Sequence, residues 1–264
     1  MNSSNCNLPP NTRLFPRGDG PLVSVLLPSR GRPQGLIASI LSFYDRALEP
    51  SRVECLIKID LDDVESQAAL AALAVTRPNL PIGIICSERG NGYADFHLWI
   101  NDLASRSQGD WLLAWNDDAQ MLTEHWDEKI EKMWYSASNT RVNRLWKAAD
   151  DFGVFYLDVE GSLGSTAFPL VRRKLTEVLG HYALDPCCDT WIMDVVSPLG
   201  IGWQMPYVKV RHRIYVDQPD GQDQTAREAM AFFAIPEDEG ALNIAEGKSR
   251  DSLKLINYLR KLKM

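Results

Sequence analysis

Short apolar runs alternate with segments of helical periodicity along the first half of the chain. The runs have the length of strands and end at polar or turn-forming residues, which is typical of strands buried on both faces. Between them, apolar side chains recur at the spacing of one helix face. The pattern predicts strands at residues 23–27, 53–59, 82–86 and 111–115, and helices at residues 36–44, 65–75 and 94–105. This alternation favours an α/β fold with a mainly parallel central sheet flanked by helices.

The second half of the chain is less regular. The expected elements are a loop at residues 158–169, a helix at 171–179, an apolar helix that starts near Asp189, and a strand at 207–214. Turn-forming residues dominate the first twenty positions. We therefore expect a flexible arm at residues 1–20, one domain at residues 21–215, and a C-terminal lid and helical tail at residues 216–264.

The composition is typical of a globular protein with a sizeable core. The chain has 264 residues, 45% of them hydrophobic, and a formal net charge of −7. This acidity argues against a nucleic-acid partner, because affinity for nucleic acid comes largely from basic side chains on phosphates. No apolar run approaches the roughly 20 residues that span a bilayer. The five cysteines show no C-x-x-C spacing, so we expect reduced thiols and a cytoplasmic protein.

Polar side chains follow each of the four predicted strands. Because the carboxyl ends of parallel strands meet at one sheet edge, we expect these side chains to lie together. The residues are Ser29 and Arg30 after the first strand, Asp60 and Asp62 after the second, Arg89 and Gly90 after the third, and Asn116, Asp117 and Asp118 after the fourth. Arginine binds phosphate oxygens, and paired carboxylates hold a divalent cation. The set indicates a nucleotide-diphosphate site, although the same residue types also form helix caps and surface ion pairs.

Two common nucleotide-binding motifs are absent from the sequence. The dinucleotide fingerprint G-x-G-x-x-G would follow the first strand, but residues 28–33 read Pro-Ser-Arg-Gly-Arg-Pro. The phosphate-binding motif G-x-x-x-x-G-K-[ST] occurs nowhere. Hydride transfer and ATP hydrolysis by those folds are therefore disfavoured.

Four segments, taken in order, resemble the inverting GT-A glycosyltransferases, in particular glycosyltransferase family 2, which uses nucleotide-diphospho-sugars. Residues 23–30 are similar to the opening strand and its polar turn, residues 57–63 to the segment whose acid contacts the base, residues 89–111 to the run into the D-x-D motif, and residues 116–118 to that motif. Asn116 stands where the family has an acid. The resemblance implies a GT-A fold with a nucleotide-binding half at about residues 21–120 and an acceptor half at about residues 121–215.

The resemblance also implies roles for individual side chains. Asp60 and Asp62 would hold the base or ribose, and Arg89 would approach the nucleotide or its diphosphate. Asp118 and His212 would hold Mn²⁺ or Mg²⁺, for which carboxylate and imidazole are suitable ligands. The nucleotide-binding residues implied are Pro28, Ser29, Arg30, Asp60, Asp62, Arg89, Gly90, Tyr93, Asn116 and Asp117. The implied donor is a UDP-sugar such as UDP-glucose, and the acceptor is a hydroxyl group of a glycan or another molecule.

An inverting transferase also needs a general base for the acceptor hydroxyl. Asp189 stands just before an apolar helix, where the family has its base, and Asp185 is the reserve candidate. Either carboxylate could instead cap that helix. Trp191 and Gly164 would adjoin the sugar or the acceptor, with core packing and an ordinary loop as the alternatives.

The C-terminal region carries two further signals. Thr225 and Glu228 have the spacing of a capping box, in a segment that could form a lid over the nucleotide. The helix predicted at residues 253–262 is basic and amphipathic, so it could touch an anionic membrane surface or dock on its own domain.

Two other functions remain open at the level of sequence. A sugar-phosphate nucleotidyltransferase would also use an α/β sheet with acids and metal, but it would need a glycine-rich basic loop after the first strand. The chain has only Gly31 between two arginines there. A non-catalytic module that binds sugar nucleotides or glycans would use the same acids for binding alone.

Overall fold

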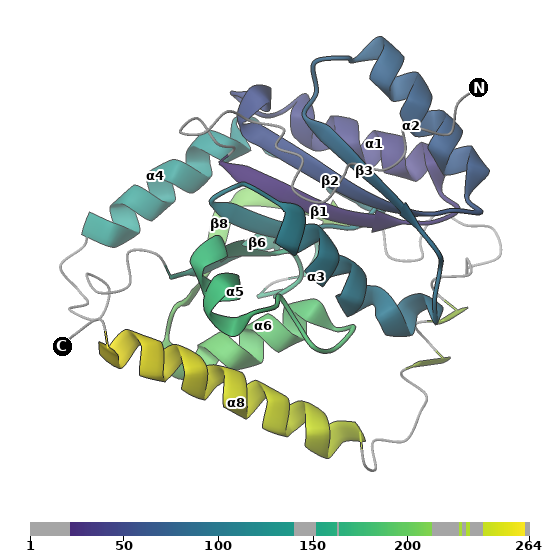
Figure 1. Cartoon of the computed structure of the whole chain (residues 1–264). Helices are drawn as coiled ribbons and strands as arrows, with labels where there is room; N and C mark the ends of the chain where they lie inside the picture. Colours follow the sequence, from purple (N-terminus) through teal and green to yellow (C-terminus); the bar gives the residue numbers. More distant parts are fainter. Residues whose placement is uncertain are drawn as a thin grey trace.

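The chain is built around an eight-stranded sheet with the strand order β3-β2-β1-β4-β7-β6-β8-β5 (Figure 1). The computed structural model describes residues 22–139, 152–162, 164–212, 227–228, 231–232 and 240–261. The strands are β1 (Val23–Ser29), β2 (Val53–Asp60), β3 (Ile82–Ser87), β4 (Trp111–Ala114), β5 (Ala119–Met121), β6 (Val154–Val159), β7 (Pro169–Arg172) and β8 (Gly202–His212). The helices are α1 (Pro33–Tyr44), α2 (Val64–Thr76), α3 (Phe96–Arg106), α4 (Trp126–Asn139), α5 (Arg173–Leu179), α6 (Cys188–Val196) and α8 (Gly240–Lys261).

The two halves of the sheet differ in strand direction. β1 pairs in parallel with β2 and β4, and β2 pairs in parallel with β3. β7 pairs antiparallel with both β4 and β6, β8 runs parallel to β6, and β5 runs antiparallel to β8. The predicted α/β fold with a helix-flanked sheet is confirmed. Its parallel arrangement holds for the first half, and the second half is mixed because β7 returns between β4 and β6.

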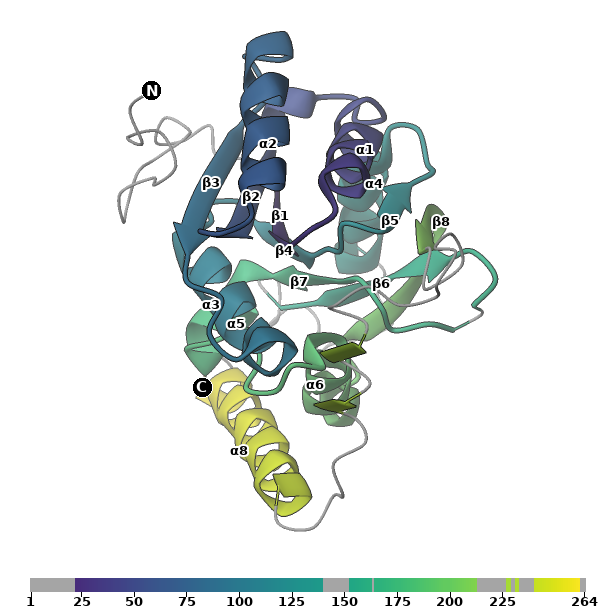
Figure 2. The same cartoon turned by 90° about the vertical axis from the view of Figure 1, so that its right-hand side faces the viewer.

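Helices cover both faces of the sheet. Figure 1 and Figure 2 show α1 and α2 on one face and α3, α5, α6 and α8 on the other. Side chains of β1 alternate between the two cores, with Val25 and Leu27 on the α1 side and Leu26 on the α3 side. Every residue of β1 is buried, which explains why this strand reads as a nearly continuous apolar run.

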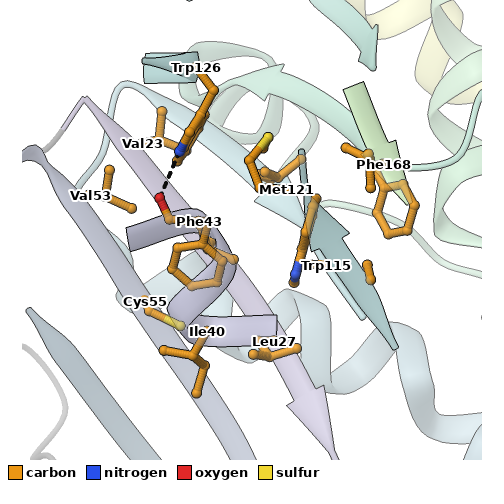
Figure 3. Close-up of a cluster of buried hydrophobic side chains, with 14 of the residues drawn as sticks. Val23, Leu27, Ile40, Phe43, Val53, Cys55, Trp115, Met121, Trp126 and Phe168 are labelled. Carbon is orange, nitrogen blue, oxygen red and sulfur yellow. Dashed lines mark hydrogen bonds between the residues drawn. The ribbon is translucent and has the colours of Figure 1, made fainter. Parts of the chain in front are cut away.

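Helix α1 fixes the segment that follows β4. Trp115 is fully buried between Phe43 of α1 and Phe168, as Figure 3 shows. Its Nε1 donates to Ser39 Oγ over 2.8 Å, and Ser39 Oγ donates to the carbonyl of Asn116 over 3.0 Å. A buried indole N–H needs such an acceptor. The acids that follow Trp115 are therefore held at a set position relative to α1.

Two element boundaries differ from the prediction for physical reasons. β1 extends through Ser29, so Pro28 lies inside the strand and not in the turn. The pairing of β1 with β4 ends at Leu26, so the missing N–H of Pro28 costs no bond on that side. Residues 171–172 belong to β7, and α5 begins only at Arg173. A strand of four residues is too short for its period to be distinguished from that of a helix.

Smaller differences concern the ends of other elements. β6 extends to Val159, into the predicted loop, and β8 begins at Gly202, before the predicted strand. The arm at residues 1–20, residues 213–214 of the predicted strand, and the polar segment at residues 216–225 lie outside the described residues.

Helix α8 packs on its own domain. Leu255 is fully buried, and Ile244, Tyr258 and Leu259 pack against the same core, together with α5 and α6. This is the docking alternative left open by the sequence, although Leu253 of the same helix stays 57% exposed. None of the helices in the described ranges is long and apolar enough to cross a membrane.

Removing the Ser39 hydroxyl should destabilise the fold. Ser39→Ala leaves the buried indole N–H of Trp115 without its acceptor, so we expect a loss of about 1–3 kcal/mol in the free energy of unfolding. Urea unfolding measures this loss. Ser105→Ala removes an exposed hydroxyl that also bonds a backbone carbonyl, and it should change stability by less than about 0.5 kcal/mol. Equal losses in the two variants would contradict the anchoring role of Ser39.

The buried carboxyl group of Glu54 predicts a pH dependence of stability. Glu54 is fully buried and accepts hydrogen bonds from Ser24 Oγ and from the N–H of Gln108. Burial raises its pKa above the ordinary value, although both bonds oppose the rise. The folded state therefore holds this proton more tightly than the unfolded state does. The contribution of Glu54 to the free energy of unfolding is fully present below its pKa in the unfolded state. It is lost as the pH rises through its higher pKa in the folded state.

Glu54→Gln should remove this fall, because an amide does not ionise. Relative to wild type, the variant should gain unfolding free energy as the pH rises from about 4.5 towards neutrality. Urea unfolding of both proteins across that range measures the difference. A difference that stays constant with pH would show that Glu54 ionises equally in both states.

Candidate active site

Asp60, the last residue of β2, is buried among three cationic side chains. Only 1% of Asp60 is exposed. Lys58 Nζ contacts Asp60 Oδ1, while Arg30 Nη1 lies 2.9 Å and Arg89 Nη1 lies 3.1 Å from Oδ2. A buried carboxylate is tolerated when it is paired. The pairing here ties the loops after β1, β2 and β3 to one point, which we call the Asp60 cluster (Lys58, Arg30, Arg89 and Asp60).

Lys58 is a site residue that sequence reasoning missed. It precedes Asp60 by two positions on the same strand, so both side chains share one face of the sheet. Its ammonium group lies 4.0 Å from the centroid of the Trp99 ring of α3, and 4% of its side chain is exposed. The available signal was a lysine inside an otherwise apolar strand, because a buried lysine needs a counter-charge.

Further contacts join the loops after β1 and β2. Arg30 binds the exposed carboxylate of Asp62 with both terminal nitrogens, and this bond lowers the pKa of Asp62. Asp63 accepts from the N–H of Gly31 over 2.7 Å and caps α2 by accepting from the N–H of Ser66 over 3.2 Å. Asp62 therefore presents an ionised carboxylate to solvent, while Asp63 supports the loop.

Asp117 points back into the loop after β1. It is 7% exposed and accepts hydrogen bonds from Ser29 Oγ and from Arg32 Nη1, both over 2.7 Å. Burial raises the pKa of Asp117 to about 6, and the charge of Arg32 limits the rise. Asp117 and Ser29 therefore hold this loop in place.

The loop after β4 meets the end of β8 at Asp118. β5 pairs with β8 in the register Ala119 to His212, which brings His212 beside Asp118. His212 Nε2 lies 3.2 Å from Asp118 Oδ1 and 3.2 Å from Asn116 Nδ2. Burial alone would raise the pKa of Asp118, but His212 and Arg32 outweigh it and hold that pKa below its ordinary value. Asp118 is therefore ionised.

The Asp118–His212 pair fits a divalent metal ion. Asp118 Oδ1 is buried, and its one close polar neighbour among the described residues is His212 Nε2, at 3.2 Å. Within the ranges that the structure describes, no group of three or more His, Cys, Asp or Glu could hold a metal. The pair could supply two ligands, and Mn²⁺ or Mg²⁺ commonly takes its others from water and phosphate oxygens.

Glu228 brings a later part of the chain to the same edge of the sheet. Arg89 Nη2 donates to Glu228 Oε1, and the N–H of Tyr93 donates to Oε2 over 3.1 Å. The rings of Tyr93 and Phe232 lie 5.9 Å apart between centroids. Gly90, one of the predicted residues, is exposed in the turn before Tyr93. Thr225, the other half of the predicted capping box, lies outside the described residues.

Asp185 and Asp189 have different surroundings at the start of α6. Asp185 is 7% exposed, and its Oδ1 accepts from the N–H of Cys187 over 2.8 Å, so it serves a local turn. Asp189 is half-buried in the first turn of α6, and its Oδ1 accepts from the N–H of Thr190 over 2.8 Å. Burial raises the pKa of Tyr93, and negative groups at the start of α6, Asp189 and Asp185 among them, raise it further. Charges at the start of α6 therefore act on the ionisation of the Tyr93 hydroxyl.

Three predicted residues lie apart from these contacts. Trp191 is 1% exposed and packs beneath α8, where a Cβ added to Gly247 would lie 2.7 Å from its ring. Its ring therefore has no open face for a sugar, and core packing, the alternative for this residue, is what the structure shows. Pro28 is buried in β1, and Gly164 lies in an exposed turn with open space around it.

The structure thus gathers most of the predicted residues around the carboxyl ends of β1 to β4 and β8. They are Ser29, Arg30, Asp60, Asp62, Arg89, Gly90, Tyr93, Asn116, Asp117, Asp118 and His212. The site has two parts, the Asp60 cluster and the Asp118–His212 pair. The loop after β1 connects them, since its Arg30 binds Asp60 and its Arg32 lies 3.7 Å from Asp118 Oδ2.

The solved structures with a similar fold include glycosyltransferases. Mannosyltransferase PcManGT from Pyrobaculum calidifontis, in complex with GDP-Man and Mn²⁺, aligns with a TM-score of 0.57 and 13% identity over 76% of this chain. TarS 1–349 of S. aureus in complex with UDP aligns with a TM-score of 0.54 and 11% identity over 89% of this chain and 70% of that one.

The chain spans 59% of the mannosyltransferase and 37% of the longer TarS chain. Neither models of protein families nor curated protein sequences give a match. At such low identity the likeness concerns the fold, and the chain has the GT-A-like fold of glycosyltransferases.

Neutralising Asp60 should destabilise the chain strongly. Asp60→Ala leaves the buried ammonium group of Lys58 without its carboxylate, so we expect a loss of about 3–5 kcal/mol in the free energy of unfolding. Chemical denaturation measures the loss. Asp62→Ala removes an exposed carboxylate from the same Arg30 and should cost much less. Similar losses in both variants would show that Asp60 is not the centre of this cluster.

Proposed function

We propose that this chain is a glycosyltransferase that moves a hexose from a nucleotide-diphospho-sugar to a hydroxyl acceptor with inversion. One observation carries the proposal. In a GT-A-like fold, an ionised Asp118 with a buried oxygen faces His212 at the sheet edge that also bears the Asp60 cluster. A metal ion would bind Asp118 and His212, and the anionic ligand that carries it would bind the arginines of the Asp60 cluster.

The donor proposed is a nucleotide-diphospho-sugar, with uridine as the favoured base. Structures of similar fold contain GDP-Man, UDP or UDP-GlcNAc, which supports a donor of this class. The choice of a UDP-sugar such as UDP-glucose rests on the resemblance seen in the sequence. Asp62 offers an exposed carboxylate for a ribose or base, and Arg30 and Arg89 supply positive charge beside it.

Asp118 and His212 would hold Mn²⁺ or Mg²⁺. A bound divalent ion would neutralise negative charge on the departing diphosphate. His212 and Arg32, whose Nη1 lies 3.7 Å from Asp118 Oδ2, hold the pKa of Asp118 below its ordinary value, so the carboxylate is ionised and able to bind a cation. Asn116, in the place of an acid, offers an amide beside His212.

Asp189 is the proposed general base. The acceptor oxygen would form a bond to the anomeric carbon as the bond to the diphosphate breaks on the opposite face, and Asp189 would take the proton of the hydroxyl group. Each carboxylate accepts one backbone N–H, but Asp189 is half-buried in the first turn of α6 whereas Asp185 is only 7% exposed, so Asp189 is the more accessible to an acceptor.

The roles of Asp118 and Asp189 can be separated by experiment. Asp118→Ala should weaken donor binding in the presence of Mn²⁺, whereas Asp189→Asn should bind the donor normally and lose transfer by at least about a hundredfold. Equilibrium dialysis with UDP-glucose measures binding, and release of UDP in the presence of candidate acceptors measures transfer. Asp185→Asn is the matched control for Asp189→Asn.

Two results would contradict these assignments. Normal transfer by Asp189→Asn would exclude Asp189 as the base. Donor binding by wild type that Mn²⁺ does not strengthen would exclude the metal role of Asp118 and His212. Donor binding without turnover in wild type and in Asp189→Asn alike would instead support a non-catalytic binding module.

A further inference from the structure

The carboxylate of Glu228 lies in a pocket of hydrogen-bond donors at the candidate donor site. Arg89 Nη2 binds one of its oxygens, and the N–H of Tyr93 binds the other over 3.1 Å. The two donors come from one short loop, while Glu228 lies 139 residues further along the chain than Arg89. The side chains of Arg89 and Glu228 are 19% and 27% exposed, so the contact is partly shielded from water.

The backbone of this loop is shaped to admit an anion. Gly92 has φ of +64°, and a Cβ at this position would overlap Glu228 Oε2. Only glycine therefore allows an acceptor oxygen to come this close to the N–H of Tyr93. A guanidinium group and a backbone N–H aimed at one point bind a phosphate oxygen by the same geometry that binds a carboxylate.

Arg89 is shared between this anion position and the Asp60 cluster. Its Nη1 lies 3.1 Å from Asp60 Oδ2, while its Nη2 binds Glu228. Asp60 is 1% exposed and cannot easily leave, whereas the contact between Arg89 and Glu228 is partly exposed to water. An incoming anion would therefore displace Glu228 and leave Asp60 in place.

We propose that Arg89 and the N–H of Tyr93 form an anion subsite that Glu228 occupies in the ligand-free chain and that a phosphate group of a bound ligand takes over. Glu228 is then an internal competitor, because a ligand binds only the fraction of molecules in which the subsite is open. The identity of the ligand as a nucleotide diphosphate rests on the proposed function, but the competition itself does not.

Inorganic pyrophosphate tests the subsite without a sugar, a base or a metal. Calorimetric titration of the full chain in EDTA at low salt should give a dissociation constant about fivefold lower for Glu228→Gln than for wild type, since the competing charge is removed. Glu88→Gln removes an exposed charge next to Arg89 and should change the constant by less than about twofold. Adding Arg89→Ala to Glu228→Gln should abolish the gain.

Pyrophosphate binding by Glu228→Gln that is equal to or weaker than that of wild type would overturn the inference. An equal gain in Glu88→Gln, or no binding to any variant, would overturn it as well. The result is independent of the proposed function. If Glu228→Gln binds pyrophosphate more tightly but the wild-type chain transfers no sugar, the subsite stands and the proposed function fails. If the chain transfers sugar but Glu228→Gln leaves pyrophosphate binding unchanged, the proposed function stands and the subsite fails.

Discussion

The buried charge of Asp60 is the constraint on which the site depends. A carboxylate that is 1% exposed requires compensation, and it receives it from Lys58 on its own strand, from Arg30 after β1 and from Arg89 after β3. These contacts hold together the loops after β1, β2 and β3. The three loops lie at one edge of the sheet because these strands are parallel. Because Arg30 also binds Asp62 and Arg89 also binds a distant acid, the same charges set what the surface offers to a ligand.

The other part of the site is fixed by packing and strand register. Trp115 is buried against α1 and bonded to Ser39, so the following acids begin at a defined point. The pairing of β5 with β8 then sets His212 next to Asp118. Neither contact depends on the Asp60 cluster, yet Arg32 links the two parts through Asp118. A sheet edge with charged groups on both sides is suited to a charged ligand.

The sequence predicts this edge well, because buried parallel strands read as apolar runs and the polar residues that end them must lie together. It predicts distant packing poorly. Burial of Trp191 depends on α8, and the contact of Arg89 with Glu228 joins residues 139 positions apart, so no local pattern reveals either. β7 is too short to show a period. The pairing of Lys58 with Asp60 can be predicted only in part. The two residues are close in sequence, but the burial of Lys58 depends on Trp99 of α3.

Calorimetric titration of the purified chain with UDP, GDP and dTDP, each with Mn²⁺ and with EDTA, decides whether this sheet edge is a nucleotide site. We expect one nucleotide, UDP in the favoured case, to bind in the presence of Mn²⁺ and to bind much more weakly in EDTA, because Asp118 and His212 would act through the metal. Absence of binding by all three nucleotides in the presence of Mn²⁺ would contradict a nucleotide site at this edge and leave only the fold.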